Sequence, residues 1–421
     1  MGMNLDQLKP IKIVILGAGF GGVYTFKRLH QFFHGNPKIK LILVNQKNYF
    51  LFTPLLHEVA TGSISPENIV EPLRKVLGCC LHDFYLAQVR KILGQPRIVE
   101  TSLGPINYDY LVVALGAQTN FYDTPGASHH CFTLKSLDDA VRLKNHFIEM
   151  FEKASKVEAV VEREKILSFV VVGGGPTGVE LAAEMSEFFY HTFNRLYPPE
   201  LMAKVKVSLV QRGQELIPQF PALLRLKSLR VLQRKGIKVY LGRAVSQVTE
   251  ELVRLDDETV LPTRTAIWVA GVKPTPPLFE PSSLPDAASR LIVNENLQLP
   301  DYPEIFVLGD MAHALDQRSG QPIPALAQAA TKEARCVADN IYNLVTDRPL
   351  QKFCYQHSGD LLSLGQWMAA GEIANIPIWG HFTWWLWRTI YLSKLISWQK
   401  KLQVALDWTI DLFSPRDISE L

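Results

Sequence analysis

The sequence contains few cysteines, and their spacing suits neither a metal site nor a redox-active pair. Only five cysteines occur in 421 residues, and none forms a CxxC motif. An odd number does not favour the disulphide framework of a secreted protein, so we expect a reducing compartment. The adjacent Cys79 and Cys80 are interpreted as small buried hydrophobic residues.

The numbers of positive and negative side chains are nearly equal. The chain has 44 basic and 41 acidic residues, a formal net charge of +3, without a long run of either sign. Neither nucleic-acid binding nor disorder is therefore favoured. The opening segment shows neither the apolar core of a signal peptide nor the composition of a transit peptide, so no targeting signal is predicted.

Motifs of several hydrolytic chemistries are missing as well. The chain has no G-x-S-x-G nucleophile motif and no P-loop. His57 and Glu58 begin an HEVAT segment that lacks the second histidine of H-E-x-x-H. We therefore interpret them as loop residues, and no metal site is predicted.

Two stretches of the chain share one order of features: a β-branched run, a glycine cluster, a helical period and a second β-branched run. The predicted strands are residues 13–16, 41–44, 169–172 and 205–210, and the predicted helices are residues 23–33 and 179–189. Strands that are apolar throughout are buried on both faces, as in a parallel sheet covered by helices. The sequence therefore predicts an α/β fold with two Rossmann-like dinucleotide-binding domains.

Each glycine cluster has the spacing G-x-G-x-x-G directly after a predicted strand. The first glycine permits a tight turn, the second lets the backbone approach a pyrophosphate, and the third lets helix and strand pack closely. The negative charge then lies at a helix N-terminus. The motif glycines are Gly17, Gly19 and Gly22 in the first copy and Gly173, Gly175 and Gly178 in the second. Two copies indicate a flavin and a nicotinamide, because FAD can accept a hydride and release electrons to another substrate.

The residue that ends the second strand of each repeat departs from the usual acid. An Asp or Glu at this position would bind ribose hydroxyl groups. The chain has Asn45 in the first repeat, whose amide oxygen can still accept such a bond, and Gln211 followed by Arg212 in the second. Without the carboxylate, and with an arginine nearby, NADPH becomes an alternative to NADH. Arg212 could equally be a solvated loop residue.

Further strands and a helix complete the predicted domains. Strands are expected within residues 111–117, 266–272 and 303–310, the first two closing their dinucleotide-binding domains, and a helix is expected over residues 325–344. The predicted FAD-binding domain comprises residues 1–125 and 290–350. Residues 126–289 form the predicted NAD(P)H-binding domain, and residues 351–421 form a C-terminal module.

The C-terminal module is rich in tryptophan. Five of the eight tryptophans fall between Trp379 and Trp398. Read as helix, apolar residues at steps of three, four or seven form one stripe: Trp384, Trp387, Tyr391, Leu395, Trp398, Leu402, Leu406 and Phe413. Charged residues interrupt the run too often for a transmembrane span. The stripe could attach the protein to one membrane leaflet, or it could pack against the body or a second subunit.

With these features in view, the whole chain resembles the type II NADH:quinone oxidoreductases, which are single-subunit alternative NADH dehydrogenases. The matching segments are residues 17–22, 49–62, 173–184, 309–310 and 327–333. The resemblance implies that the first repeat and Asp310 hold FAD, with Thr53 beside the flavin. It also implies that Glu180 lies at the nicotinamide side and that the A-Q-x-A-x-x-E signature lies beside the flavin on the quinone side. That signature matches Ala327, Gln328, Ala330 and Glu333.

The expected site follows from the motifs and the resemblance together. The expected FAD-binding residues are Gly17, Gly19, Phe20, Gly21, Gly22, Asn45, Thr53, Gly116, Gly309, Asp310 and Ala327. The expected NAD(P)H-binding residues are Gly173, Gly175, Thr177, Gly178, Gln211, Arg212 and Gly271. The expected catalytic residues are Gln328, Glu333 and Glu180.

The expected reaction is hydride transfer from NADH or NADPH to non-covalent FAD, followed by transfer of two electrons to a membrane quinone without proton pumping. A homodimer on the cytoplasmic face of the cell membrane is expected, with a quinone and lipid as partners and no nucleic acid. One alternative is a reductase with another acceptor: an NADPH-preferring enzyme of quinone biosynthesis, or a sulfide:quinone reductase, which would need paired cysteines near the flavin. The other is a redox-responsive binding protein.

Overall fold

The computed structural model describes residues 9–78, 83–274, 278–280, 289–318 and 320–420. The predicted burial of Cys79 and Cys80 concerns positions outside these ranges. The chain forms two compact units. Unit 1 comprises residues 1–50, 71–118 and 272–357, and unit 2 comprises residues 51–70, 119–271 and 358–421.

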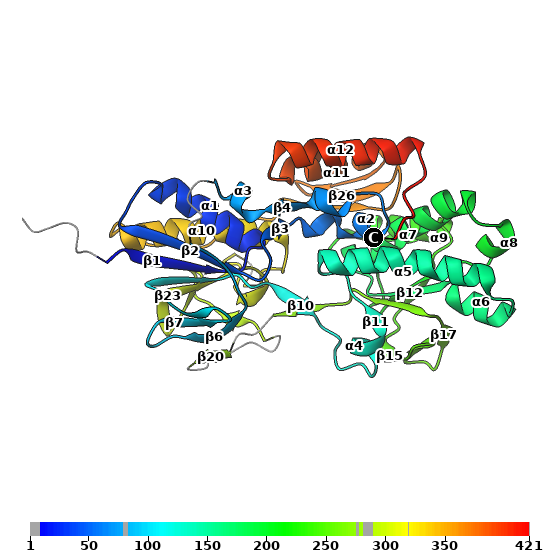
Figure 1. Ribbon diagram of the computed structural model, residues 1–421, viewed down its shortest axis with the longest axis horizontal. Coiled ribbons are helices and arrows are strands. Elements are labelled where there is room, and N and C mark those ends of the chain that lie inside the picture. The colour runs from blue at the N-terminus through cyan, green and yellow to red at the C-terminus, as the bar shows by residue number, and fades with distance from the viewer. Residues whose placement is uncertain (1–8, 79–82, 275–277, 281–288, 319, 421) are drawn as a thin grey trace, which may run out of the picture. The chain divides into compact units, whose positions relative to one another are not determined.

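Unit 1 is built on a six-stranded sheet in the order β22-β23-β9-β1-β2-β5, in which every neighbouring pair is parallel except the antiparallel β22 and β23. Its strands are β1 (Ile11–Leu16), β2 (Ile39–Asn45), β5 (Phe84–Leu86), β9 (Tyr110–Val113), β22 (Gln298–Leu299) and β23 (Tyr302–Val307). Helices α1 (Phe20–Phe33) and α10 (Ala327–Val345) lie side by side on this sheet (Figure 1). An ion pair of 2.8 Å between Arg28 and Asp339 and the stacked rings of Phe32 and Tyr342 join them.

A second sheet covers part of the six-stranded sheet of unit 1. It has the order β20-β6-β7-β8, with β6 (Val89–Leu93), β7 (Ile98–Thr101), β8 (Gly104–Asn107) and β20 (Leu278–Glu280). Ile92, Val99 and Ile106 from this sheet join Val14 and Ile42 of the larger sheet in one hydrophobic core. The parallel strands are therefore buried on both faces, as their continuous apolar sequence predicts.

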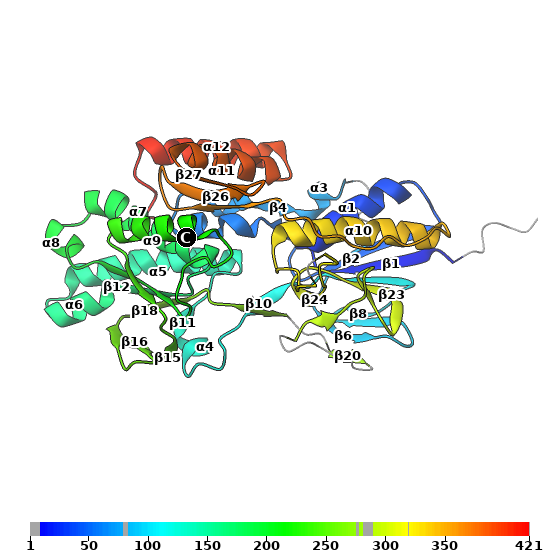
Figure 2. The ribbon, with the colours of Figure 1, turned by 180° about the vertical axis from the view of Figure 1, so that it is seen from behind.

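Unit 2 contains the second parallel sheet, in the order β11-β18-β12-β13-β14. Its strands are β11 (Cys131–Phe132), β12 (Ser168–Val172), β13 (Lys206–Gln211), β14 (Lys238–Leu241) and β18 (Thr265–Trp268). The longer helices around it are α5 (Leu137–Lys156), α7 (Pro176–Glu187) and α9 (Ala222–Arg234). The antiparallel strands β15 (Val245–Val248), β16 (Leu252–Leu255) and β17 (Val260–Pro262) complete this part (Figure 2).

The C-terminal part of unit 2 is a small antiparallel sheet with two helices. Its strands are β25 (Asp360–Ser363), β26 (Ala369–Ile373) and β27 (Ile376–Gly380), and its helices are α11 (His381–Lys394) and α12 (Trp398–Phe413). Figures 1 and 2 show both helices on the same side of this sheet. Among the described residues, no helix has the length and apolar character that spanning a membrane requires.

The prediction of one continuous aromatic stripe in this part is wrong. The helix breaks after Lys394, because Leu395 has the extended angles φ −61° and ψ 143°. On one side of the break Trp384 and Trp387 are at most 2% exposed, whereas on the other side Trp398 and Phe413 are 71% and 80% exposed. The break rotates the second half of the stripe away from the core.

The structure confirms both strand-glycine-helix repeats and moves their boundaries. Both helices begin within the glycine clusters, at Phe20 and Pro176, rather than three residues later. The second helix continues beyond Glu187 as a π-helical turn, Phe188–Thr192. Strands β9 and β18 confirm two further predicted strands, and both lie inside their sheets rather than at an edge.

Candidate active site

The first glycine loop joins β1 to α1 in unit 1. Gly17 has φ +95°, a left-handed angle that glycine adopts at low cost. A Cβ atom at Gly22 would overlap the Gly17 carbonyl oxygen, so this position brings the helix onto the loop. At Gly19, which is the N-cap of α1, an added Cβ would meet no atom within 4 Å. Open space therefore lies where a pyrophosphate would approach the helix N-terminus.

The second glycine loop repeats this geometry between β12 and α7 in unit 2. Gly173 has φ +118°, and a Cβ there would lie 2.8 Å from the Ala270 Cα atom. A Cβ at Gly178 would overlap the Gly173 carbonyl oxygen, whereas one at Gly175 would meet nothing within 4 Å. The two loops differ in sequence but share this geometry. Because each leaves open space at its second glycine, both fit a dinucleotide pyrophosphate.

The two amide side chains at the ends of β2 and β13 support the glycine loops. The Asn45 Oδ1 atom accepts a 3.0 Å hydrogen bond from the Ala18 backbone N–H. The Gln211 Oε1 atom accepts a 2.9 Å hydrogen bond from the Gly174 backbone N–H. Their expected role at the ribose stays a prediction, and this support of the loops was not expected from the sequence. An amide oxygen has two lone pairs, so each keeps capacity for a second donor.

Glu333 and the Gly309-Asp310 turn meet in unit 1. The Gly309 N–H donates a 2.6 Å hydrogen bond to the Glu333 Oε2 atom from α10. Burial and the nearby Asp310 charge raise the pKa of Glu333, the Gly309 N–H opposes the rise, and together these effects set the pKa at about 7. The structure thus places Glu333 against the backbone of the turn, and its expected catalytic role stays a prediction. Gln328, one turn earlier on the same helix, is half-buried.

The remaining expected cofactor residues are glycines and loop residues near the two turns. In unit 1, Gly21 packs closely against the Leu308 side chain, and Gly116 has φ +73° with open space around it. In unit 2, Gly271 has φ +75° beside Tyr122, and Thr53 is exposed at the start of a 3-10 turn, Thr53–Leu55. Nothing in these contacts assigns a ligand to them, so their roles stay predictions.

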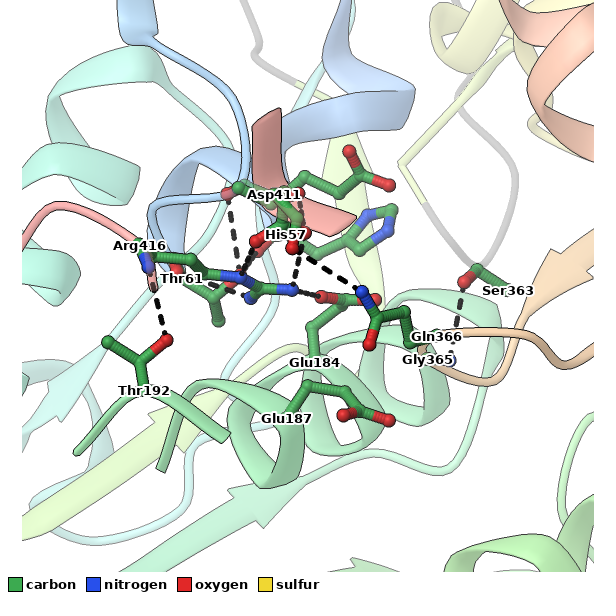
Figure 3. Close-up of polar contacts among 12 residues, drawn as sticks. His57, Thr61, Glu184, Glu187, Thr192, Ser363, Gly365, Gln366, Asp411 and Arg416 are labelled. Carbon is green, nitrogen blue, oxygen red and sulfur yellow. Dashed lines mark hydrogen bonds and ion pairs between the residues drawn. The ribbon is translucent and has the colours of Figure 1, made fainter. Parts of the chain in front are cut away.

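The interpretation of His57 and Glu58 as loop residues is wrong. They lie on helix α2 (Leu56–Ala60), and both are at most 3% exposed. Glu180 of α7 is buried beside them: its Oε1 atom accepts a 3.2 Å hydrogen bond from the Ser363 backbone N–H, and its Oε2 atom lies 3.9 Å from the His57 Nδ1 atom. Glu180 therefore belongs to a buried polar cluster of unit 2, shown in part in Figure 3.

Sequence reasoning missed the rest of this cluster. Arg416, close to the C-terminus, binds Asp411 and Glu184 with N–O distances of 2.8 Å and 2.9 Å (Figure 3). Arg388 lies with its guanidinium carbon 3.7 Å from the centre of the Trp384 ring. Glu184 lies 232 residues before Arg416 in the chain, and no local spacing signals their contact.

Comparison with known proteins agrees with this geometry. Residues 11–334 match the family model described as pyridine nucleotide-disulphide oxidoreductase, the class that two glycine loops of this kind define. Residues 357–417 match the NDH2 C-terminal domain. The chain belongs to the type II NADH:quinone oxidoreductase family, as its sequence motifs predict.

Relatives from distant organisms cover nearly the whole chain. A type II NADH:quinone oxidoreductase of Mycobacterium tuberculosis is 31% identical over 96% of this chain and 89% of its own. A probable NADH dehydrogenase of Dictyostelium discoideum is 30% identical over 97% of this chain and 91% of its own. The structure of NDH2 from Plasmodium falciparum in complex with NADH has a TM-score of 0.91, with 20% identity over 98% of this chain and 100% of that one, which confirms the fold.

Proposed function

We propose that this protein is an NADH:quinone oxidoreductase that uses FAD and does not pump protons. The observation that carries this proposal is the pair of glycine loops, each with open space above its second glycine at the start of a helix. Bound FAD would supply the redox chemistry, accepting a hydride from the nicotinamide and passing two electrons to the quinone. Family membership and the C-terminal NDH2 domain support this reaction.

The chain's own residues bind and orient the two dinucleotides. We assign FAD to the loop at Gly17–Gly22 and to Asp310, which Glu333 supports through the Gly309 N–H. We assign the nicotinamide coenzyme to the loop at Gly173–Gly178. With them we retain the domain boundaries that the sequence suggests, with FAD on residues 1–125 and 290–350, NAD(P)H on 126–289 and a C-terminal module on 351–421. Gln328, on α10, is assigned to the quinone side.

The residues at the end of β13 favour the use of NADPH as well as NADH. Gln211 brings no negative charge that would repel a 2′-phosphate. Arg212 is exposed, and no ion pair joins it to any residue that the structure describes. A guanidinium that is not held by a carboxylate can bind a phosphate in a bidentate manner. We therefore infer that the enzyme uses both coenzymes.

The outer face of α12 is proposed to bind a membrane surface. Five large apolar side chains along it are more than half exposed: Trp398, Leu402, Leu406, Ile410 and Phe413. Their spacing of three or four residues places them on one face, which suits an interfacial helix. Truncation before Trp379 would also remove the buried Trp384 and Trp387. Substitutions on the exposed face test the proposal more cleanly.

We further propose attachment to the cytoplasmic face of the cell membrane and a homodimer. The exposed apolar face supports membrane attachment and a homodimer, because the area of such a face can be shared between lipid and a second copy. Quinone then reaches the enzyme from the membrane. Sedimentation with vesicles and the molar mass in detergent test these two points separately.

Rapid-mixing kinetics test the reaction itself. Purified yellow protein is mixed anaerobically with NADH or NADPH, and loss of the flavin absorbance is followed. The reduced protein is then mixed with a short-chain quinone. We expect fast reduction by NADH and fast reoxidation by the quinone. A colourless protein that cannot be reconstituted with FAD would refute the proposal, and slow reoxidation would favour a redox-responsive binding protein.

A further inference from the structure

A cluster of ionisable side chains is buried in unit 2, and it contains more acids than bases. Four carboxyl groups, those of Glu58, Glu180, Glu184 and Asp411, are each at most 7% exposed. The two guanidinium groups among them, Arg388 and Arg416, are at most 9% exposed. An unpaired buried charge is costly. Full ionisation would leave two carboxylates without a cation, so the cluster is expected to retain protons at neutral pH.

Two of these carboxyl groups are held directly by the Arg416 guanidinium group. Its Nε atom binds Asp411 Oδ1 at 2.8 Å, and its Nη2 atom binds Asp411 Oδ2 at 3.2 Å and Glu184 Oε2 at 2.9 Å. Its Nη1 atom donates to the Thr61 carbonyl oxygen at 3.3 Å. The Ser63 hydroxyl also donates to Asp411, at 3.1 Å. Charge-assisted bonds of this kind favour the ionised form of both acids.

Glu58 makes no guanidinium contact of this kind with any arginine that the structure describes. Its Oε2 atom accepts a hydrogen bond from the Trp408 indole N–H, a neutral donor. Burial and the Glu184 charge raise the pKa of Glu58, against the lowering effects of Arg388, Trp408 and Arg416, and together these effects set it at about 8. Burial also raises the pKa of Glu184, and Arg416 opposes that rise. The proton in this part of the cluster therefore resides on Glu58.

His57 cannot take over this proton. It is fully buried, and burial lowers its pKa to about 3, helped by the nearby Arg416 charge. Its Nε2 atom is buried and accepts no hydrogen bond from any residue that the structure describes. The ionisable and polar groups that act on Glu58 come from its own helix and from the elements that pack around it: His57, Glu180, Glu184, Arg388, Tyr391, Trp408 and Arg416. Asp411 is held by Arg416, and Lys144 of α5, which also packs against α2, interacts with Asp417.

We propose that Glu58 holds a proton that quinone reduction takes up, and that Arg416 is a positioning residue that confines this proton to Glu58 by keeping Asp411 and Glu184 ionised. The proposal rests on the proposed function. Reduction of a quinone to a quinol needs two electrons and two protons. The hydride taken from NADH supplies both electrons and one proton, Glu58 supplies the second proton, and solvent then reprotonates Glu58.

Glu58→Gln is the central variant, because its amide oxygen still accepts the Trp408 hydrogen bond but the side chain carries no titratable proton. In the holoenzyme we expect flavin reduction by NADH to stay within about twofold of wild type. Reoxidation by a short-chain quinone should slow by about 100-fold, the lower range of general acid catalysis. Glu58→Asp should restore part of the rate. Equal reoxidation rates in Glu58→Gln and wild type would overturn the proposal.

Infrared spectra of the holoenzyme give a readout that does not depend on turnover. At neutral pH the wild type should show C=O bands of buried protonated carboxyl groups, those of Glu58 and Glu180, and Glu58→Gln should lose one of these components. Arg416→Gln should gain a further band, because Glu184 and Asp411 lose their cation, whereas Arg416→Lys should resemble wild type. An unchanged set of bands in Glu58→Gln would refute the assignment even if Arg416→Gln does not fold.

Glu184→Gln tests the charge arrangement by its effect on pH dependence. This variant removes the charge that raises the pKa of Glu58. The fall of the reoxidation rate on the alkaline side of its pH profile should therefore move to lower pH. Arg264→Gln is the matched control, since Arg264 binds Glu162 and Glu251 in a more exposed ion-pair group of unit 2. An unchanged pH profile in Glu184→Gln would overturn the role of Arg416. A wild type that reduces no quinone would instead refute the proposed function.

Discussion

Gly175 offers a sharp test of the coenzyme site, because its replacement should affect binding and stability in opposite directions. Its backbone has φ −75° and ψ −177°, angles that alanine adopts without strain. An added Cβ would touch no protein atom within 4 Å. The Gly175→Ala protein should therefore fold, and the less flexible unfolded chain should make it more stable by about 0.4–1 kcal/mol.

The same methyl group would occupy the space through which a pyrophosphate approaches α7. Displacement of one charge-assisted hydrogen bond between the helix N-terminus and the phosphate costs about 1.5–3 kcal/mol. Because about 1.4 kcal/mol corresponds to a factor of ten, NADH should bind roughly 10- to 100-fold more weakly. Flavin content should not change, since the first loop is untouched.

Titration of the holoenzyme with NAD⁺ and thermal unfolding measure both effects. Gly19→Ala is the matched variant in the first loop, where an added Cβ also meets nothing within 4 Å, and it should lose flavin instead. Gly178→Ala would overlap the Gly173 carbonyl oxygen and should destabilise the fold. If Gly175→Ala binds the coenzyme as tightly as wild type, the assignment of this loop is wrong.

Three further perturbations test other parts of the molecule. Gln211→Glu places a carboxylate where a 2′-phosphate would bind, so the ratio of kcat/KM for NADPH to that for NADH should fall by about tenfold or more; an unchanged ratio would show that selectivity is set elsewhere. Leu402→Glu combined with Leu406→Glu should abolish sedimentation with anionic vesicles while flavin content and circular dichroism stay normal, and continued sedimentation would contradict the membrane face. Glu333 has a pKa raised from 4.5 to about 7 in the folded protein, so its contribution to stability is complete below about pH 4.5 and is lost as the pH rises through 7. The thermal midpoint of Glu333→Gln should therefore fall less between about pH 5 and pH 8 than that of wild type. If the midpoints of the two proteins change with pH in parallel, the pKa of Glu333 is not raised.

The local sequence determined the two dinucleotide-binding repeats. Continuous apolar runs fix buried parallel strands, because both faces of such strands must leave water. The glycine spacing fixes the loop geometry, since Gly17 and Gly173 need left-handed angles and Gly22 and Gly178 leave no room for a Cβ. These features depend on neighbours within about 40 residues, so the fold class and the pyrophosphate sites could be predicted from the pattern alone.

Only the tertiary structure decided which C-terminal side chains are buried. One periodic pattern ran through Trp384, Trp387, Trp398 and Phe413, yet a break after Lys394 buries the first two and exposes the others. The sequence pattern continues across the break because each helix is amphipathic by itself. Periodicity records the spacing of apolar residues along a helix and does not record the angle between two helices.

The buried charge cluster was equally out of reach of the sequence. Glu58, Glu184 and Arg416 lie far apart along the chain, and each looks like an ordinary surface residue there. Folding brings α2, α7 and the C-terminal segment together and removes water from between them. Burial and the unequal number of acids and bases then set the protonation of the group, because a charge is stable in the interior only beside a partner of opposite sign.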